Sequence, residues 1–296
     1  MKMKPCGIFM APIRTYVKYI GEVAEWLKAP LSKSGRRATV SRVQIPPSPH
    51  NNMKSNKQFI LEEKYQGKRG LRFYIDLLKL YLGIPVAYII GTQPFLKLQI
   101  KLKHRVLIPR PETEFWLKKY VIDKLPGDEK MSILDIFSGT GCLGLALAQE
   151  FPLSNVTLTD KNKKFVKLIK ENADLNRLQN IEAIRSDIFS EIPKKKYDLI
   201  LANPPYISFF MFNFSLLILL ENWRSLFAKD RGLFFIKKML KYVDKYMNDN
   251  GVVFIEFDPW QRDIIEGLLQ KKYRHFKYKF LKDQYDKYRV LSLSLA

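Results

Sequence analysis

The sequence predicts an open α/β sheet of parallel strands, preceded by a small helical segment. From Met131 onward, short apolar runs alternate with amphipathic helical stretches, the pattern of consecutive βαβ units. The chain has 296 residues, of which 47% are hydrophobic. This is enough apolar material for a large core, so a wholly disordered protein is excluded.

The segment before the sheet is predicted to contain a helix and a hairpin. Phe59–Leu82 places apolar residues three and four positions apart on one face, and Gly83 and Pro85 end this pattern. The residues of that face are Leu71, Tyr74, Ile75, Leu78, Tyr81 and Leu82. Leu96–Leu102 then alternates apolar and polar residues like a half-buried strand, and Val106–Ile108 is its predicted hairpin partner.

The α/β part contains five predicted strands and four predicted helices. The strands are Ile133–Ile136, Val156–Thr159, Ile181–Ile184, Tyr197–Leu201 and Val252–Phe257. The helices lie near Cys142–Glu150, Lys163–Asn176, Leu233–Met247 and Trp260–Leu269. In an open sheet of this kind the ligand site is expected beyond the carboxyl ends of the strands.

Charge and residue usage restrict the class of site. The formal charge of +22 favours an acidic partner such as RNA, ribosomes or anionic membrane, and equally fits a Lys-rich solvated surface. Cys6 and Cys142 lie far apart, which excludes a disulfide framework and indicates a reducing compartment. His50, His104 and His275 lack ligand spacing, so no metal site is predicted.

The apolar stretch Phe209–Leu220 is shorter than the roughly 20 residues that span a bilayer. It is therefore predicted to be a buried or partner-facing segment, and no membrane insertion is expected. Residues 1–52 are rich in Lys and Arg and poor in acidic residues, which is typical of a mitochondrial transit peptide. Alternatively, Gly21–Lys28 and Arg42–Pro47 can be back-translated into tRNA-gene-like DNA, in which case translation would start at Met53.

A small-residue turn, Phe137–Gly141, follows the first predicted strand directly. Glycines let a backbone approach a ligand closely, and the following helix begins with unpaired N–H groups, although a plain strand-to-helix turn has the same pattern. Asp160 ends the next strand, where a carboxylate can accept hydrogen bonds from ribose hydroxyls. Asp187 follows the third strand and could flank an adenine ring, or either Asp could be a helix N-cap.

The most specific motif is Asn203-Pro204-Pro205-Tyr206, at the end of the fourth strand. The prolines stiffen the loop and donate no backbone hydrogen bond. The Asn203 side-chain oxygen and the Pro204 carbonyl could each accept one hydrogen of a planar NH₂ group, with the Tyr206 ring on its flat face. A proline-rich turn with a core tyrosine is the structural alternative.

These motifs together resemble the S-adenosylmethionine-dependent methyltransferases, and more narrowly the HemK/PrmC family of protein glutamine-N5 methyltransferases. The resemblance runs from Gly83 to the C-terminus and is most specific in GIPVAYIIG, Gly83–Gly91, and VLIPRPETE, Val106–Glu114. It implies a class I, Rossmann-like fold with a seven-stranded, mostly parallel sheet and an antiparallel last strand. The implied parts are a non-structural extension 1–52, a helical docking domain 53–92, a linking β-hairpin 93–110 and a methyltransferase domain 111–296.

The resemblance also implies an activity, which is methyl transfer from S-adenosylmethionine to the glutamine amide in the GGQ motif of a peptide chain release factor. Asn203 and Pro204 would hold that amide, with Pro205 and Tyr206 beside it. The implied cofactor contacts are Phe137, Ser138, Gly139, Thr140, Gly141, Asp160, Asp187, Ile188 and Asn203. Phe137 stands where the family usually has glycine, which predicts a tighter pocket there, and Ile188 replaces an often aromatic residue.

Two other functions stay open at this stage. The charge and the shared loop motif also fit a DNA or RNA amino-methyltransferase, for which no target-recognition domain is evident. A catalytically degenerate RNA-binding relative is the second. Nucleic acid is thus an optional partner. The expected location is the mitochondrion, with the cytoplasm as the alternative.

Overall fold

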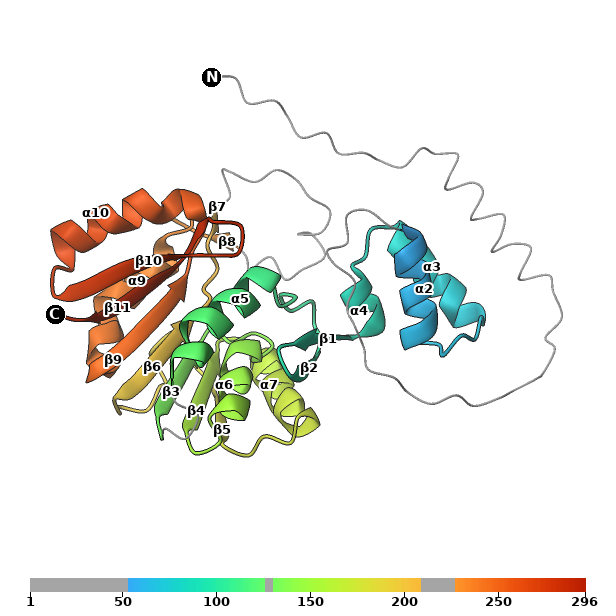
Figure 1. The fold of residues 1–296 in the computed structure, drawn as a ribbon, viewed down its shortest axis with the longest axis horizontal. Coiled ribbons are helices and arrows are strands. Elements are labelled where there is room, and N and C mark those ends of the chain that lie inside the picture. Colours follow the sequence, from blue (N-terminus) through green and yellow to red (C-terminus); the bar gives the residue numbers. More distant parts are fainter. Residues whose placement is uncertain (1–52, 126–129, 209–226) are drawn as a thin grey trace, which may run out of the picture. The chain divides into compact units, whose positions relative to one another are not determined.

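The computed structural model describes residues 53–125, 130–208 and 227–296. The chain divides into two compact units, one ending at Ile90 and one running from Gly91 to Ala296 (Figure 1). The predicted extension 1–52 and the apolar stretch Phe209–Leu220 lie outside the described residues. Within the described ranges, no helix is long and apolar enough to cross a membrane.

The small unit contains three helices: α2 (Met53–Glu63), α3 (Leu71–Tyr81) and α4 (Val86–Ile90). The prediction of helix over Phe59–Leu82 is wrong in the middle, because residues 64–70 form a turn. In that turn the backbone at Gln66 and Gly67 has left-handed φ angles of 51° and 79°. Glycine adopts this conformation without strain, which explains why α2 ends there.

The apolar face predicted for α3 is not the face that packs. Leu71, Ile75, Leu78 and Leu82 are 46%, 45%, 45% and 54% exposed. The buried positions are instead those around Phe73 and Leu77, which pack with Ile60 of α2. The small unit has only one thin core, so a helix with apolar residues on more than one side can bury only one of them.

The large unit is built on a seven-stranded sheet in the order β10-β11-β9-β6-β3-β4-β5 (Figure 1). Its strands are β3 (Ser132–Ile136), β4 (Asn155–Asp160), β5 (Ile181–Arg185), β6 (Tyr197–Ala202), β9 (Met247–Glu256), β10 (Phe276–Lys282) and β11 (Tyr288–Leu295). The pairs β6–β9, β3–β6, β3–β4 and β4–β5 are parallel, whereas β11 is antiparallel to both of its neighbours. The predicted mostly parallel sheet with an antiparallel last strand is confirmed.

Helices cover both faces of this sheet. They are α5 (Pro111–Tyr120), α6 (Cys142–Glu150), α7 (Lys163–Leu175), α9 (Phe234–Tyr242) and α10 (Arg262–Lys272). Leu134 and Ile136 of β3 share a core with α9 and α10, while Asp135 between them faces α6. This alternation follows from the two-residue period of a strand and produces a three-layer α/β/α unit.

Several predicted boundaries differ from the structure. The helix predicted for Leu233–Met247 ends as α9 at Tyr242 and continues as the 3₁₀ turn η4 (Val243–Tyr246), after which β9 begins at Met247. The 3₁₀ turn η5 (Pro259–Gln261) precedes α10, and η1 (Ile122–Lys124) follows α5. A short parallel pair, β7 (Ile207–Ser208) with β8 (Phe227–Ala228), lies beside the sheet.

The hairpin exists, but its predicted partner strand is wrong. Strand β2 (Leu98–Lys101) pairs with β1 (Thr92–Phe95), which precedes it, and Val106–Ile108 forms no strand. The reason is a pair of left-handed residues, His104 and Arg105, which turn the chain away from the hairpin after β2. Val106 is thereby brought, fully buried, to the wall of the pocket described below.

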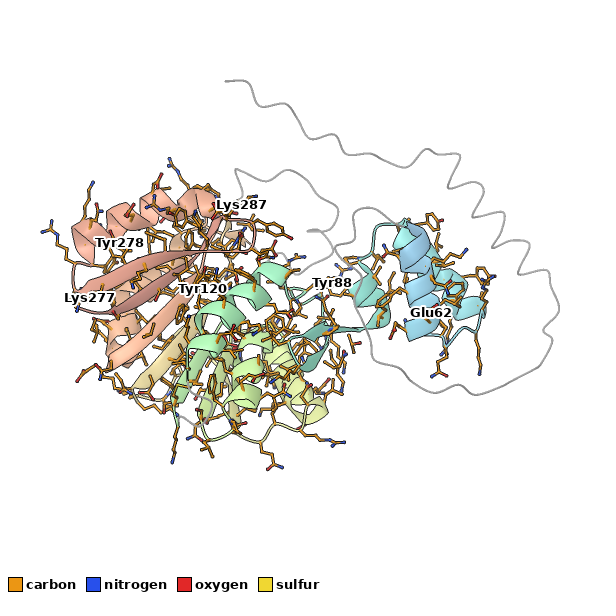
Figure 2. All side chains as sticks on the ribbon, in the orientation of Figure 1. Glu62, Tyr88, Tyr120, Lys277, Tyr278 and Lys287 are labelled. Atoms are coloured by element: carbon orange, nitrogen blue, oxygen red, sulfur yellow. The ribbon has the colours of Figure 1, made fainter. Side chains whose placement is uncertain are left out.

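The outer edge of the sheet carries charge. Lys277 and Lys279 are exposed on the edge strand β10, with the half-buried Tyr278 between them. Figure 2 shows Lys277 and Tyr278 on this strand. Lysine on an edge strand opposes pairing with a strand of another molecule. This part of the basic composition therefore has a structural explanation that needs no nucleic acid.

Candidate active site

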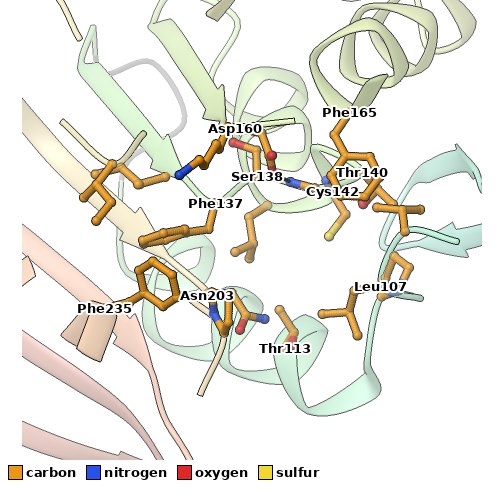
Figure 3. Close-up of a pocket in the computed structure, with 18 of the residues that line it drawn as sticks. Leu107, Thr113, Phe137, Ser138, Thr140, Cys142, Asp160, Phe165, Asn203 and Phe235 are labelled. Carbon is orange, nitrogen blue, oxygen red and sulfur yellow. Dashed lines mark hydrogen bonds between the residues drawn. The ribbon is translucent and has the colours of Figure 1, made fainter. Parts of the chain in front are cut away.

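A pocket lies at the carboxyl ends of the central strands, where an open α/β sheet is expected to bind ligands. Two loops contribute to its wall. We call Phe137–Gly141 the glycine loop and Asn203–Tyr206 the proline loop. Figure 3 shows Asp160, Ser138 and Thr140 on one side of the pocket and Asn203 and Thr113 on the other.

The glycine loop is fixed by hydrogen bonds to neighbouring strands. The Ser138 hydroxyl donates to the carbonyl of Asp135 (2.8 Å), and the Thr159 amide donates to the Ser138 hydroxyl oxygen (3.0 Å). Gly141, with a φ of 84°, is the N-cap of α6. The backbone angle therefore favours glycine, and a Cβ atom there would also be in tight contact with Leu145 Cδ1, at 3.1 Å.

Phe137 occupies an unusual conformation in this loop. Its φ is 62°, a region that bulky residues rarely adopt, and its ring meets Phe235 of α9 edge to face at 5.3 Å. The ring also lines the pocket. Phe137 therefore lies at the pocket wall, and the expectation that the pocket is tighter here stays a prediction.

Asp160 joins the glycine loop to the start of α7. Its carboxylate accepts hydrogen bonds from the amides of Gly139 (3.0 Å) and Asn162 (2.8 Å). Burial raises the pKa of this carboxyl group to about 6, and the hydrogen bonds from the two amides partly oppose this increase. Each carboxylate oxygen has a further lone pair, so Asp160 can also accept from a ligand hydroxyl.

Asp187 and Ile188 form the rim and the wall of the pocket beyond β5. Asp187 is exposed and pairs with Lys161 at 2.5 Å. Ile188 is buried and has a left-handed φ of 61°. A flat ligand ring can pack against the Ile188 side chain.

The proline loop presents an unsatisfied acceptor. The Asn203 side-chain oxygen Oδ1 is buried and accepts no hydrogen bond from any residue in the described ranges. A buried acceptor without a donor is unfavourable and rare in native structures, so it calls for an explanation. A ligand that donates N–H to Asn203 would supply one, because Asn203 lines the pocket.

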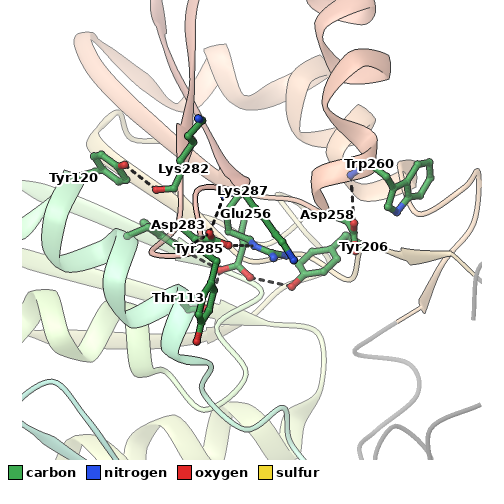
Figure 4. A network of polar contacts seen from close by, with 12 residues as sticks. Thr113, Tyr120, Tyr206, Glu256, Asp258, Trp260, Lys282, Asp283, Tyr285 and Lys287 are labelled. Atoms are coloured by element: carbon green, nitrogen blue, oxygen red, sulfur yellow. Dashed lines mark hydrogen bonds and ion pairs between the residues drawn. The ribbon is translucent and has the colours of Figure 1, made fainter. Parts of the chain in front are cut away.

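Tyr206 is held at both ends. Its hydroxyl donates to Glu256 Oε1 (2.9 Å) (Figure 4). Its carbonyl accepts from Gln261 Nε2 (3.0 Å). Burial and the neighbouring Glu256 carboxylate raise the pKa of the Tyr206 hydroxyl well above its usual range, so this group is a permanent donor.

Glu256, at the end of β9, is only 1% exposed. Its Oε2 accepts from the Thr113 hydroxyl (2.7 Å) and the Trp116 indole (2.8 Å), both on α5. Burial raises the pKa of Glu256, while these donors, Tyr206 and the nearby Arg289 oppose the shift. Arg289 itself pairs with the buried Asp283 at 3.2 Å.

The pocket brings together most of the residues singled out from the sequence. The predicted residues that line it are Phe137, Ser138, Gly139, Thr140, Asp160, Asp187, Ile188, Asn203 and Pro205. Gly141, Pro204 and Tyr206 are not among its lining residues. In the described ranges, no group of three or more His, Cys, Asp or Glu side chains could hold a metal ion.

Sequence reasoning missed Thr113 and Glu256 as site residues. Thr113 lines the pocket together with Val106, Leu107, Pro109 and Arg110 from the segment before α5. The signal for these residues was the family-specific stretch Val106–Glu114. Glu256 gave a weaker signal, a carboxylate at the carboxyl end of a predicted strand.

Comparison with known proteins agrees with this geometry. The family described as Methyltransferase small domain matches residues 118–215. A methyltransferase from Pyrococcus furiosus has a similar fold, with a TM-score of 0.51 and 18% identity over 68% of this chain and 89% of that chain.

Two curated relatives are similar over most of their length. The release factor glutamine methyltransferase of Streptococcus pneumoniae (strain ATCC BAA-255 / R6) is 34% identical over 236 residues, 79% of this chain and 83% of the relative. That of Lactococcus lactis subsp. lactis (strain IL1403) is 32% identical over 218 residues, 73% and 79% of the two chains. The chain therefore belongs to the release factor glutamine methyltransferase family.

Proposed function

We propose that the protein transfers a methyl group from S-adenosylmethionine to the side-chain amide nitrogen of the glutamine in the GGQ motif of a peptide chain release factor. The unsatisfied Asn203 Oδ1 at the pocket wall carries this proposal, because a primary amide brings the N–H donor that this buried acceptor lacks. Family membership supports the substrate class.

The polar and apolar groups that line the pocket fit S-adenosylmethionine. Asp160 has lone pairs for the ribose hydroxyls, and Ile188 offers an apolar surface for the adenine ring. The glycine loop, with left-handed φ at Phe137, Gly139 and Gly141, would hold the methionine part. When bound, the cofactor supplies an electrophilic methyl group on a sulfonium.

The protein's own task is to make an amide nitrogen act as a nucleophile. That nitrogen is weak because its lone pair is delocalised into the carbonyl. We assign Asn203 Oδ1 and the Pro204 carbonyl as acceptors for the two amide hydrogens, which aims the nitrogen at the methyl group. After transfer, the nitrogen releases one of these hydrogens to water as a proton. Positioning and electrostatic stabilisation then carry the catalysis, without a strong general base.

The setting that we propose is translation termination in the mitochondrion, with the cytoplasm as the alternative. The basic, acid-poor composition of residues 1–52 supports the mitochondrial setting. Offering mitochondrial and cytosolic release factors side by side tests it, because preference for one factor indicates where the reaction occurs.

The experiment that tests the function follows labelled methyl from S-adenosylmethionine into a mixture of release factors, DNA and RNA. We expect label on a release factor. Label on nucleic acid alone would refute the proposal and support a DNA or RNA amino-methyltransferase. Cofactor binding without any transfer would instead indicate a degenerate relative.

A further inference from the structure

We infer that Glu256 is a positioning residue for methyl transfer, which holds the proline loop at a set distance from α5 on one side of the pocket. This inference rests on the proposed function. It concerns a side chain that lies behind the pocket and does not line it. Glu256 would therefore act on the substrate amide only through Tyr206 and Thr113.

The two carboxylate oxygens of Glu256 accept hydrogen bonds from two different elements that lie on the same side of the pocket. Oε1 accepts from the Tyr206 hydroxyl at 2.9 Å, and Oε2 accepts from Thr113 at 2.7 Å and Trp116 at 2.8 Å (Figure 4). Thr113 lines the pocket on α5, and Asn203, three residues before Tyr206, lines it on the proline loop. One rigid planar group thus bridges the two elements that would enclose the substrate amide.

A second contact fixes the other end of Tyr206. Gln261 Nε2 donates to the carbonyls of both Tyr206 (3.0 Å) and Arg231 (3.1 Å). Gln261 is itself fixed by a capping box with Asp258 at the start of η5. The last residue of the proline loop is therefore anchored through its hydroxyl and its carbonyl, so the loop has little freedom to shift.

This anchoring explains how Asn203 Oδ1 stays unpaired. A free loop would relax until the buried oxygen met a donor, because an unsatisfied buried acceptor is costly. Tyr206, clamped by Glu256 and Gln261, prevents that relaxation and keeps the acceptor ready for the substrate. A carboxylate that served stability alone would be a poor choice here, since apolar replacement of buried charges is often neutral or stabilising.

The test is a double-mutant cycle of Tyr206→Phe and Glu256→Gln, measured as methyl transfer to a release factor. Tyr206→Phe removes only the hydroxyl that Glu256 holds. We expect each single variant to lower kcat about 10- to 100-fold, with the dissociation constant of S-adenosylmethionine within about twofold of wild type. We expect the double variant to be no slower than the slower single variant. Additive losses would overturn the inference.

A matched control separates positioning from general stability. Asp283 is also a buried carboxylate, but it accepts from Arg289 (3.2 Å) and from the Tyr285 and Lys287 amides (2.9 and 3.0 Å) and makes no hydrogen bond to Tyr206. Asp283→Asn should lower the melting temperature, and its effect on kcat should multiply with that of Tyr206→Phe. If the kcat effects of Asp283→Asn and Tyr206→Phe were as non-additive as those of Glu256→Gln and Tyr206→Phe, the network would be merely structural and the inference would be overturned.

Two further readouts keep the result decisive. If Glu256→Gln does not fold, Tyr206→Phe alone decides, since a wild-type kcat for that variant would refute the inference. Backbone amide hydrogen exchange at Asn203 and at residues 206–208 should rise in Tyr206→Phe without any substrate present, and unchanged exchange would count against anchoring of Tyr206 by Glu256. The wild-type protein in the same assay reports on the proposed function separately: no transfer to any release factor refutes the function.

Discussion

The glycine loop and the proline loop face one pocket, but they are held in different ways. The glycine loop is fixed by bonds over short distances in the sequence, such as Gly139 to Asp160 across 21 residues. The proline loop depends on Glu256, which bonds Tyr206 across 50 residues and Thr113 across 143. The first arrangement follows from one βαβ unit, β3-α6-β4, whereas the second exists only when distant parts of the fold have assembled.

The two loops also differ in the buried carboxylates behind them. Asp135 lies under the glycine loop, where the Gly144 amide donates to its Oδ2 (3.0 Å) and Oδ1 has no donor among the described residues. Glu256, behind the proline loop, receives three donors. Local structure at the glycine loop thus tolerates an incompletely satisfied carboxyl group, while at the proline loop both carboxylate oxygens of Glu256 accept hydrogen bonds.

The largest expected effect separates the chemistry of the two loops. Asn203→Ala should lower kcat/KM for methyl transfer on the order of 10³-fold, or about 4 kcal/mol, because it removes an acceptor for the substrate amide. Cofactor affinity should change little, since Asp160 and the glycine loop are intact. The melting temperature should stay the same or rise, because a buried unpaired acceptor is lost. A variant as active as wild type would refute the assigned role.

The second prediction concerns the buried charge under the glycine loop. Burial raises the pKa of Asp135 from 3.8 to about 7. Between these values the folded protein binds more protons than the unfolded one, so stability falls as pH rises, by about 4 kcal/mol in total. Asp135→Asn should flatten this decline in urea unfolding measured from pH 4 to pH 7.5. An equal slope in both proteins would contradict the assignment.

A third variant perturbs the proline loop from outside. A Cβ atom at Gly232, whose φ is 78°, would lie 2.0 Å from the Tyr206 carbonyl oxygen. Gly232→Ala should therefore displace Tyr206, lower kcat about 10- to 100-fold and destabilise the protein by about 1–3 kcal/mol.

The matched control for this variant is Gly267→Ala in α10. A Cβ atom there would meet nothing within 4 Å, so the substitution should stabilise the protein by about 0.5–1 kcal/mol. If kinetics and melting curves show the same change for both glycine variants, the close approach at Gly232 is not what holds Tyr206.

The smallest expected effect belongs to the glycine-loop side. Asp160→Asn should weaken S-adenosylmethionine binding about tenfold, or about 1.4 kcal/mol, with little change in kcat at saturating cofactor. In the wild-type protein the pKa of Asp160 is raised to about 6. Affinity for S-adenosylmethionine should therefore rise as the pH increases through about 6, because the ionised carboxylate is a better hydrogen-bond acceptor. Calorimetry from pH 5 to pH 8 checks both points, and a pH-dependent affinity in Asp160→Asn would assign the titration elsewhere.

The part of the fold that could be predicted is the part with local signals. The five predicted strands of the α/β part and the helix Cys142–Glu150 are confirmed, because each has its own hydrophobic period and a turn beside it. The hairpin partner and the packed face of α3 were wrong, since the left-handed turn at His104 and Arg105 and the burial of Phe73 depend on tertiary context.

The same distinction applies to the site. Phe137–Thr140, Asp160 and Asn203 could be found because each follows a strand directly, and parallel strands end at one edge of the sheet. Thr113, on α5, meets Glu256 only through the three-dimensional fold, and no periodicity links two residues 143 positions apart. The hydrogen bonds that hold Tyr206 could therefore be identified only from the structure.

The measurement that tests the central claim most directly is tandem mass spectrometry of a release factor after incubation with the protein and S-adenosylmethionine. The account predicts one added methyl group on the side-chain nitrogen of the GGQ glutamine, and none on a release factor in which that glutamine is replaced by glutamate. Methyl on any other side chain, or on the glutamate-bearing factor, would contradict the role that we assign to Asn203 and the proline loop.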